Sequence, residues 1–275
     1  MRVGIIAALV AALLVSGCGS GGRETPGRRT VVAAFYPLAW AAEQVAGAAV
    51  EVGNLTPPGV EPHDLELSAR DVERVRGADL VVYVGGGFMA ALEDALEHRP
   101  GPSLDVRGDA PDPHVWLDPR SFSAVASAIA EALGDPSRAD PLLARLEQLD
   151  RELHDGLTSC ARREIVTSHA AFGSLAAAYG LRQIALTGIS PEAEPTPRAL
   201  ERLVDQVRAS GATTVFAEPL VSSRLARTVA REAEVEVAVL DPIEGLSEER
   251  LAAGEDYVSV MRDNLATLRE ALGCR

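Results

Sequence analysis

Short apolar runs alternate with longer amphipathic segments over most of the chain after residue 30. In the first half, runs rich in apolar and β-branched residues at 30–36, 50–56 and 78–85 predict strands. Residues 37–47, with proline at the start and glycine at the end, and residues 68–77, with a serine–aspartate capping box, predict helices. The unbroken apolar run at 78–85 suits a strand buried on both faces. This alternation predicts a parallel sheet with helical crossovers.

The second half repeats the pattern. Strands are predicted at 163–169, 181–188, 213–219 and 235–242, and helices at 170–180, 196–211 and 222–234. Between the two series, leucines recur at helical spacing on one face of residues 137–160. We therefore predict an α/β fold of two parallel-sheet lobes, an N-terminal lobe at 30–135 and a C-terminal lobe at 161–275, joined by one long helix at 136–160.

The first residues have the layout of an exported protein. Arg2 precedes the apolar run from Val3 to Val15, which is short for a membrane span and is followed by small residues and Cys18. VSGC resembles the lipobox of bacterial lipoproteins, with Val15 where leucine is more common. Residues 1–18 are thus interpreted as a lipoprotein signal peptide ending in a lipidated Cys18, and residues 19–29 as a flexible tether. We expect an extracytoplasmic domain held by its lipid at the outer face of the cell membrane.

Net charge and cysteine content bear on the kind of partner and on disulfide formation. The formal net charge is −14, and loss of Arg2 makes it more negative. An acidic surface excludes nucleic acid as a partner, because phosphate binding needs clustered basic residues. After Cys18 only Cys160 and Cys274 remain. In an exported chain the two can form a disulfide, which in the chain-entropy model would stabilise the fold by about 4–5 kcal/mol because the loop it closes is long. Two free thiols are the alternative.

Four residues combine metal-ligating chemistry with positions near strand ends. They are His63, His114, His169 and Asp241. Three of them lie just beyond the carboxyl end of a predicted strand, where open parallel sheets bind ligands. Their wide spacing excludes a local zinc-finger site and requires a site assembled from distant elements.

The loop around His114 has a composition that restricts its backbone. In DAPDPHVWLDPR (109–120), Pro113 and Pro119 limit the residues before them, so the imidazole sits in a stiff segment. The remaining histidines, His98 and His154, lie in charged helical surroundings and are interpreted as solvated surface residues.

These segments carry a resemblance to the zinc/manganese solute-binding lipoproteins of ABC importers. The resembling motifs are PPGVEPHDLELSARD (57–71), HVWLDPR (114–120), TSHAAFGSLAAAYG (167–180), GISPEAEPTPRAL (188–200) leading toward FAEP and LDP, and DYVSVMRDNLATLREAL (256–272). The resemblance implies that His63, His114, His169 and Asp241 bind the metal in the cleft between two lobes. It also implies a membrane permease of an ABC transporter as partner.

Two departures from the family pattern are visible. Many zinc-specific members carry a histidine-rich loop between the first two ligands, whereas residues 88–113 contain only His98. GGGFMAALED (85–94) replaces the usual residues after the third strand, so the next helix is expected to begin differently.

The donor set favours zinc as the transported ion. Three imidazoles and one carboxylate suit Zn2+, whereas Mn2+ prefers more oxygen donors and manganese-loading members typically have a carboxylate at the position of His169. Glu61 and Glu218 are candidates for an additional ligand or for groups that orient a ligand histidine.

The predicted function is to capture a divalent metal ion, with zinc favoured by donor type, and to deliver it to a permease. The protein is expected to be a monomeric binding protein and not an enzyme. A manganese- or iron-loading member of the same family is the alternative. A secreted zinc hydrolase is a further one, but HExxH is absent and four ligands leave no position for water. A binding protein for chelated iron would instead need an aromatic or arginine-lined cleft.

Overall fold

The computed structural model describes residues 28–48, 50–191 and 195–275. The predicted signal peptide, Cys18 and most of the tether lie outside these residues. The strands are β1 (Arg29–Ala33), β2 (Val50–Asn54), β3 (Leu80–Tyr83), β4 (Ser103–Asp105), β5 (Glu164–Thr167), β6 (Arg182–Ala185), β7 (Thr214–Ala217) and β8 (Glu236–Val239).

Helices connect these strands. The α-helices are α1 (Tyr36–Ala46), α2 (Ala69–Gly77), α3 (Ala90–Leu96), α4 (Pro119–Ala132), α5 (Asp140–Thr158), α6 (Gly173–Ala178), α7 (Pro197–Ser210), α8 (Arg224–Ala233), α9 (Glu248–Ala252) and α10 (Tyr257–Leu272). Three 3₁₀ turns are η1 (Pro62–Asp64), η2 (Val115–Leu117) and η3 (Pro136–Ala139). None of the helices in the described ranges is both long and apolar enough to span a bilayer.

The strands form two parallel sheets with the same strand order. One sheet runs β2-β1-β3-β4 and the other β6-β5-β7-β8. In both, the first strand of the series pairs with the second and third, so the order reverses at the first strand. Parallel pairing requires a crossover after each strand, which the helices provide. The predicted fold class, two parallel-sheet α/β lobes, is confirmed.

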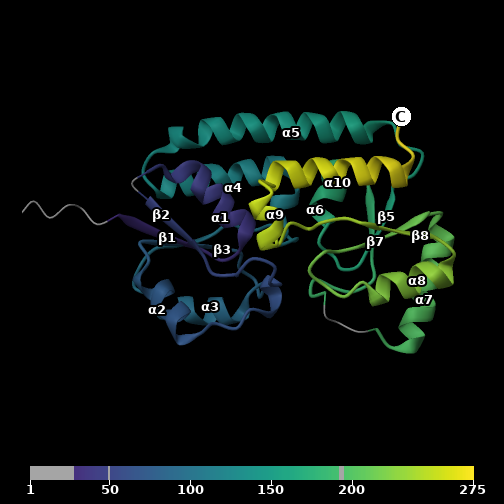
Figure 1. The fold of residues 1–275 in the computed structure, drawn as a ribbon, viewed down its shortest axis with the longest axis horizontal. Helices are drawn as coiled ribbons and strands as arrows, with labels where there is room; N and C mark the ends of the chain where they lie inside the picture. The colour runs from purple at the N-terminus through teal and green to yellow at the C-terminus, as the bar shows by residue number, and fades with distance from the viewer. Residues whose placement is uncertain (1–27, 49, 192–194) are drawn as a thin grey trace, which may run out of the picture.

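Helices cover both faces of the sheets. Figure 1 shows α5 and α10 side by side along one side of the molecule, reaching from one lobe to the other. On the opposite side, α2 and α3 lie beside the first sheet, and α7 and α8 beside the second. The long helix predicted at 136–160 thus corresponds to η3 and α5, and α10 accompanies it.

The larger of two hydrophobic clusters extends through both lobes. Its members include Val81 in β3, Leu149 in α5, Ile165 in β5 and Leu268 in α10, all fully or almost fully buried. A second, smaller cluster lies between α7, α8 and the second sheet. On α5, Leu142, Leu146, Leu149, Leu153 and Leu157 are buried, and each such side chain contributes about 1.5–3 kcal/mol. The two lobes therefore share one packed core.

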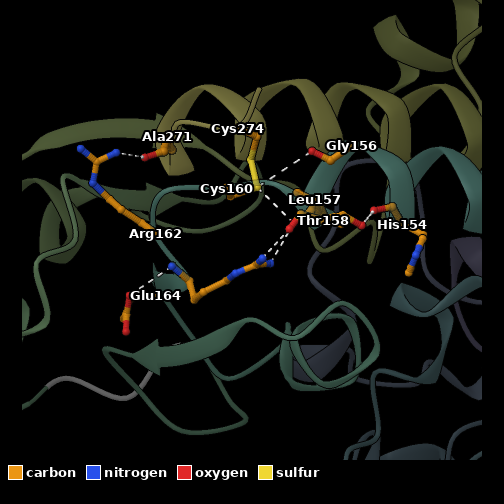
Figure 2. Close-up of a disulfide and its surroundings, with 10 residues drawn as sticks. His154, Gly156, Leu157, Thr158, Cys160, Arg162, Glu164, Ala271 and Cys274 are labelled. Atoms are coloured by element: carbon orange, nitrogen blue, oxygen red, sulfur yellow. Dashed lines mark hydrogen bonds between the residues drawn. A yellow bond between two sulfur atoms is a disulfide. The ribbon is translucent and has the colours of Figure 1, made fainter.

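The end of α5 is joined covalently to the end of the chain. Cys160 and Cys274 form a disulfide that closes 114 residues of sequence separation. Figure 2 shows this bond beside α5, with the Arg162 guanidinium donating to the carbonyl of Ala271 close by. The bond fixes the C-terminal end of α10 to the start of the second series.

Several elements differ from the sequence prediction. Helices α4 and α9 and strand β4 were not predicted. α4 begins at Pro119 with Asp118 as its N-cap, because the Asp118 carboxylate accepts from the backbone N–H groups of Arg120 and Ser121. β4 has only three residues, too few for a clear alternating pattern.

Candidate metal centre

The loops after the carboxyl ends of the strands converge at one place between the lobes. His63 lies in η1 after β2, and His114 immediately before η2 after β4. His169 follows β5 by two residues, and Glu244 lies in the loop after β8. Because the strands within each sheet are parallel, the loops of each lobe leave its sheet at the carboxyl edge, where open α/β sheets bind ligands.

Four side chains bring their donor atoms together. One donor atom each from His63, His114, His169 and Glu244 lies within 4.8 Å of the other three. Glu244 Oε1 is 3.4 Å from His63 Nε2, 3.3 Å from His114 Nε2 and 3.4 Å from His169 Nε2. A tetrahedron with metal–ligand bonds of about 2.0–2.1 Å has edges of about 3.3–3.4 Å, so these separations match zinc coordination.

The donor atoms are buried and have no hydrogen-bond partners. The Nε2 atoms of the three histidines and both carboxylate oxygens of Glu244 are inaccessible and unpaired among the described residues. Buried polar atoms without partners are costly, and several that point at one another indicate a place for an ion. Burial alone would raise the pKa of Glu244, but the three histidines hold this pKa well below its usual value. The carboxylate is therefore charged and able to bind a cation.

His114 is oriented by Asp112, whose carboxylate connects the two lobes. Asp112 Oδ1 accepts from the backbone N–H of His114 at 3.0 Å and lies 2.8 Å from its Nδ1. Asp112 Oδ2 accepts from the backbone N–H and the hydroxyl of Ser174 in α6. A Cβ on Gly173 would lie 2.7 Å from this oxygen, so glycine permits the close approach. With Nδ1 occupied, Nε2 of His114 is left for a metal.

His169 is held by Glu218 in the same manner. Glu218 Oε2 lies 2.6 Å from His169 Nδ1, and Oε1 accepts from its backbone N–H at 3.1 Å. Burial lowers the pKa of His169, but the Glu218 and Glu244 carboxylates outweigh it and raise this pKa to about 10. Glu218 thus fixes the orientation of the His169 imidazole.

His63 is the least restrained of the three histidines. Its ring lies against Phe88, with 4.2 Å between ring centroids. Glu61 Oε1 accepts from the backbone N–H of His63 at 3.2 Å, whereas Glu61 Oε2 is buried without a partner. Burial and the nearby Glu244 charge raise the pKa of Glu61 to about 8. Through its bond to the His63 backbone N–H, Glu61 caps the turn η1 that carries His63.

Asp241 is not part of this cluster. Its carboxylate accepts from the backbone N–H of Ile243 at 2.7 Å and pairs with Arg250 at 2.6 Å. The fourth corner, for which the sequence predicted Asp241, is occupied by Glu244 three residues later. The turn between them cannot be read from residue types. The sequence signal for Glu244 is a carboxylate flanked by apolar residues in PIEGL (242–246), and Asp112, two residues before His114, was not singled out either.

Solvent approaches the cluster on the side of His63. A cavity of about 220 Å3 is lined by His63, Phe88, Arg107 and Pro113 from the first lobe and Ile189 from the second. His114 and His169 are fully buried, whereas His63 retains some exposure. His98 and His154 are exposed and lie outside the cluster, as predicted.

Comparison with known proteins gives consistent matches. Residues 31–271 match the family described as zinc-uptake complex component A, periplasmic. The zinc-binding lipoprotein AdcA of Streptococcus pneumoniae is 31% identical over 304 residues, which cover 98% of this chain and 60% of AdcA. The high-affinity zinc uptake system protein ZnuA of Bacillus subtilis is 29% identical, with 94% of each chain covered. This chain thus spans about 60% of the length of AdcA but nearly all of ZnuA.

Solved structures agree with the sequence matches. The Zn(II)-bound ZnuA-like domain of Streptococcus pneumoniae AdcA superimposes with a TM-score of 0.76 at 33% identity, covering 90% of this chain and 99% of that domain. The laminin-binding protein Lmb of Streptococcus agalactiae, described as an adhesin with metal-transporting activity, gives a TM-score of 0.80 at 30% identity, covering 89% and 99%. The periplasmic zinc-binding protein TroA of Treponema pallidum shares the fold, with a TM-score of 0.80 at 23% identity.

Proposed function

The chain belongs to the family of zinc-uptake complex component A, and from this premise we propose that it captures a zinc ion outside the cytoplasm and delivers it to the permease of an ABC importer. One observation carries the proposal: three imidazole nitrogens lie 3.3–3.4 Å from one buried carboxylate oxygen. That spacing fits a tetrahedral zinc ion, which the protein binds as cargo.

His63, His114, His169 and Glu244 are proposed as the ligands. The sequence prediction placed Asp241 in the fourth position, and the contacts of Asp241 with Ile243 and Arg250 support giving that position to Glu244 instead. Three nitrogen donors and one carboxylate favour Zn2+ over Mn2+, which prefers oxygen donors. Manganese or iron as the physiological cargo remains the alternative within the family.

A binding protein accounts for the site better than a hydrolase. A catalytic zinc needs an open position for water and a nearby general base. Here four donors surround the ion position, and the nearest further carboxylates, Glu218 and Glu61, are engaged with His169 and His63. The relatives named above are zinc-binding and zinc-uptake proteins, which supports transport.

Location follows from the sequence and the relatives together. The signal-peptide pattern and Cys18 support a lipid anchor at the outer face of the cell membrane, and the AdcA relative is a zinc-binding lipoprotein. We propose that the protein acts as an anchored monomer whose exposed surface meets the permease. Zinc would enter through the cavity beside His63, the ligand nearest to solvent.

Metal content of the purified protein tests the proposal. The protein is isolated without chelators, its metals are measured by mass spectrometry, and stripped samples are titrated with zinc and with manganese. We expect one zinc per chain, retained against excess manganese, and loss of affinity by orders of magnitude in His114→Ala. His154→Ala, an exposed histidine on α5, is the matched control. Retained manganese or iron would support the alternative cargo, and absence of any tightly bound metal would refute transport of a bare ion.

A further inference from the structure

The residue predicted as the fourth ligand has a different set of contacts. Asp241 is 5% exposed and immediately precedes the turn that carries Glu244. Its Oδ1 accepts from the backbone N–H of Ile243 at 2.7 Å, and its Oδ2 accepts from Arg250 Nη1 at 2.6 Å. The backbone of Asp241 exchanges two hydrogen bonds with the side chain of Asn264 in α10, at 2.9 and 2.7 Å. The start of this turn is therefore attached to α10 and to α9.

The turn contains an unfavourable backbone conformation. Ile243 has φ +58° and is completely buried. A β-branched side chain rarely adopts the left-handed region, and such a residue costs about 1–3 kcal/mol. The conformation persists only where surrounding contacts hold it, and the Asp241 carboxylate bonds directly to the N–H of this residue. The next residue is Glu244, whose Oε1 meets the three histidines.

The opposite lobe holds the same turn. Trp116 Nε1 donates to the carbonyl of Pro242 at 2.7 Å, and Trp116 lies fully buried two residues after His114. The Tyr257 hydroxyl in turn donates to the carbonyl of Trp116 at 2.5 Å. Contacts from both lobes thus define where the turn lies, and Asp241 is the residue in the turn that bonds to the strained position.

From these contacts we infer that Asp241 is a positioning residue for Glu244: it stabilises the left-handed turn at Ile243 and so holds the Glu244 carboxylate at the zinc position without binding the ion. Residues that orient metal ligands typically change metal affinity 10- to 100-fold when mutated. The inference rests on the proposed function, because its effect is expressed through zinc affinity.

A double-mutant cycle separates positioning from direct binding. Zinc dissociation constants are measured by competition with a chromophoric chelator for the unaltered chain, Asp241→Ala, Glu244→Ala and the double variant. We expect Asp241→Ala alone to weaken zinc binding about 10- to 100-fold. In the Glu244→Ala background the same change should cost less than about threefold, since a residue that acts only through Glu244 has nothing left to position.

The controls address folding and local geometry. Asp241→Asn keeps an oxygen that can accept from the backbone N–H of Ile243 but removes the charge that faces Arg250, so it should retain more zinc affinity than Asp241→Ala. If Asp241→Ala fails to fold, Asp241→Asn takes its place in the cycle. Asp135→Ala removes an exposed carboxylate that pairs with Arg138 and should leave affinity unchanged.

Two outcomes would contradict the inference in distinguishable ways. If Asp241→Ala weakened zinc binding by the same factor in the unaltered chain and in Glu244→Ala, Asp241 would act independently of Glu244, as a ligand or through general destabilisation. That result would overturn this inference and leave the proposed function standing. Absence of tight zinc binding in the unaltered chain would overturn the proposed function and this inference with it.

Discussion

Glu218 contacts His169 twice, through Nδ1 at 2.6 Å and through the backbone N–H at 3.1 Å. With Nδ1 engaged by Glu218, Nε2 of His169 lies 3.4 Å from Glu244 Oε1 and has no hydrogen-bond partner among the described residues. His114 has the same arrangement with Asp112. Two of the three histidines thus have a carboxylate behind them, as zinc-binding histidines in proteins commonly do.

Removing the charge behind His169 should weaken zinc binding. In Glu218→Gln, the amide cannot stabilise the donated Nδ1 proton as a carboxylate does, so zinc affinity should fall about 10- to 100-fold. Isothermal titration of the stripped protein measures the change. Glu152→Gln, which removes a surface pair with Arg262, should bind like the unaltered chain. Equal affinities for all three proteins would show that Glu218 does not support the site.

A methyl group at Gly173 should also weaken binding, through Asp112. The added Cβ would lie 2.7 Å from Asp112 Oδ2 and push the carboxylate away from Ser174 and His114. We expect Gly173→Ala to lower zinc affinity about tenfold, although alanine favours a helix over glycine. Gly77→Ala, where a Cβ would meet nothing within 4 Å, is the matched control. If Gly173→Ala bound zinc normally, the contact between the lobes at Asp112 would be unimportant.

Zinc binding should release protons above neutral pH. The pKa of His169 is raised to about 10, so in the metal-free protein this imidazole is protonated at pH 7–9 and must lose the proton to bind zinc. Apparent affinity should therefore rise about tenfold per pH unit for each proton released and level off near pH 10. For an unperturbed histidine the same dependence would lie near pH 6.5.

Calorimetry in buffers of different ionisation enthalpy counts the released protons at pH 8. Glu218→Gln should release fewer, because the neutral side chain no longer raises the pKa of His169. Linkage gives the opposite trend for stability of the metal-free protein. The pKa of His169 is higher in the folded than in the unfolded protein, so its protonation stabilises the folded state. This contribution to the free energy of unfolding is complete below about pH 6.5 and is lost as the pH rises through about 10. Proton release that is absent at pH 8 would contradict the prediction.

Reduction of the disulfide should destabilise the fold without changing the site. The bond between Cys160 and Cys274 closes 114 residues, and removal of a native disulfide typically lowers the free energy of unfolding by about 2–5 kcal/mol. Urea unfolding of the Cys160→Ser, Cys274→Ser double variant and of the oxidised protein gives the difference in their free energies of unfolding. Zinc affinity should stay the same, since the disulfide joins the residues that follow α5 and α10 (Figure 2), whereas the donor residues belong to the loops between the lobes. A thiol count of two on the unreduced, denatured protein would exclude the bond.

Metal preference should follow the donor at position 169. A carboxylate there would add an oxygen donor and favour manganese, but it would replace an imidazole whose Nδ1 lies 2.6 Å from Glu218 and would thus place two carboxylates side by side. We therefore expect His169→Glu combined with Glu218→Gln to shift the zinc-to-manganese affinity ratio toward manganese, and His169→Glu alone to bind both metals poorly. Competition titrations give the ratio. A double variant that still rejects manganese would refute the argument from donor type.

The sequence by itself determined the architecture and three quarters of the donor cluster. Strand and helix periodicities depend on neighbouring residues, so the βα alternation and the leucine face of α5 could be read directly. His63, His114 and His169 stood out because the chain has few histidines, and because His63 and His169 follow predicted strand ends while His114 lies in a proline-rich loop. Short elements such as β4 and α9 were missed, because too few residues define their pattern.

Only the tertiary structure decided which carboxylate completes the cluster. Asp241 ends a strand and looked like a ligand, whereas Glu244 lies three residues farther along a loop. The choice depends on the left-handed turn at Ile243, which contacts from Asp241, Arg250 and Trp116 stabilise. These partners come from separate elements of both lobes. A backbone conformation held by distant contacts leaves no local signal in the sequence, because its energy comes from residues far away along the chain.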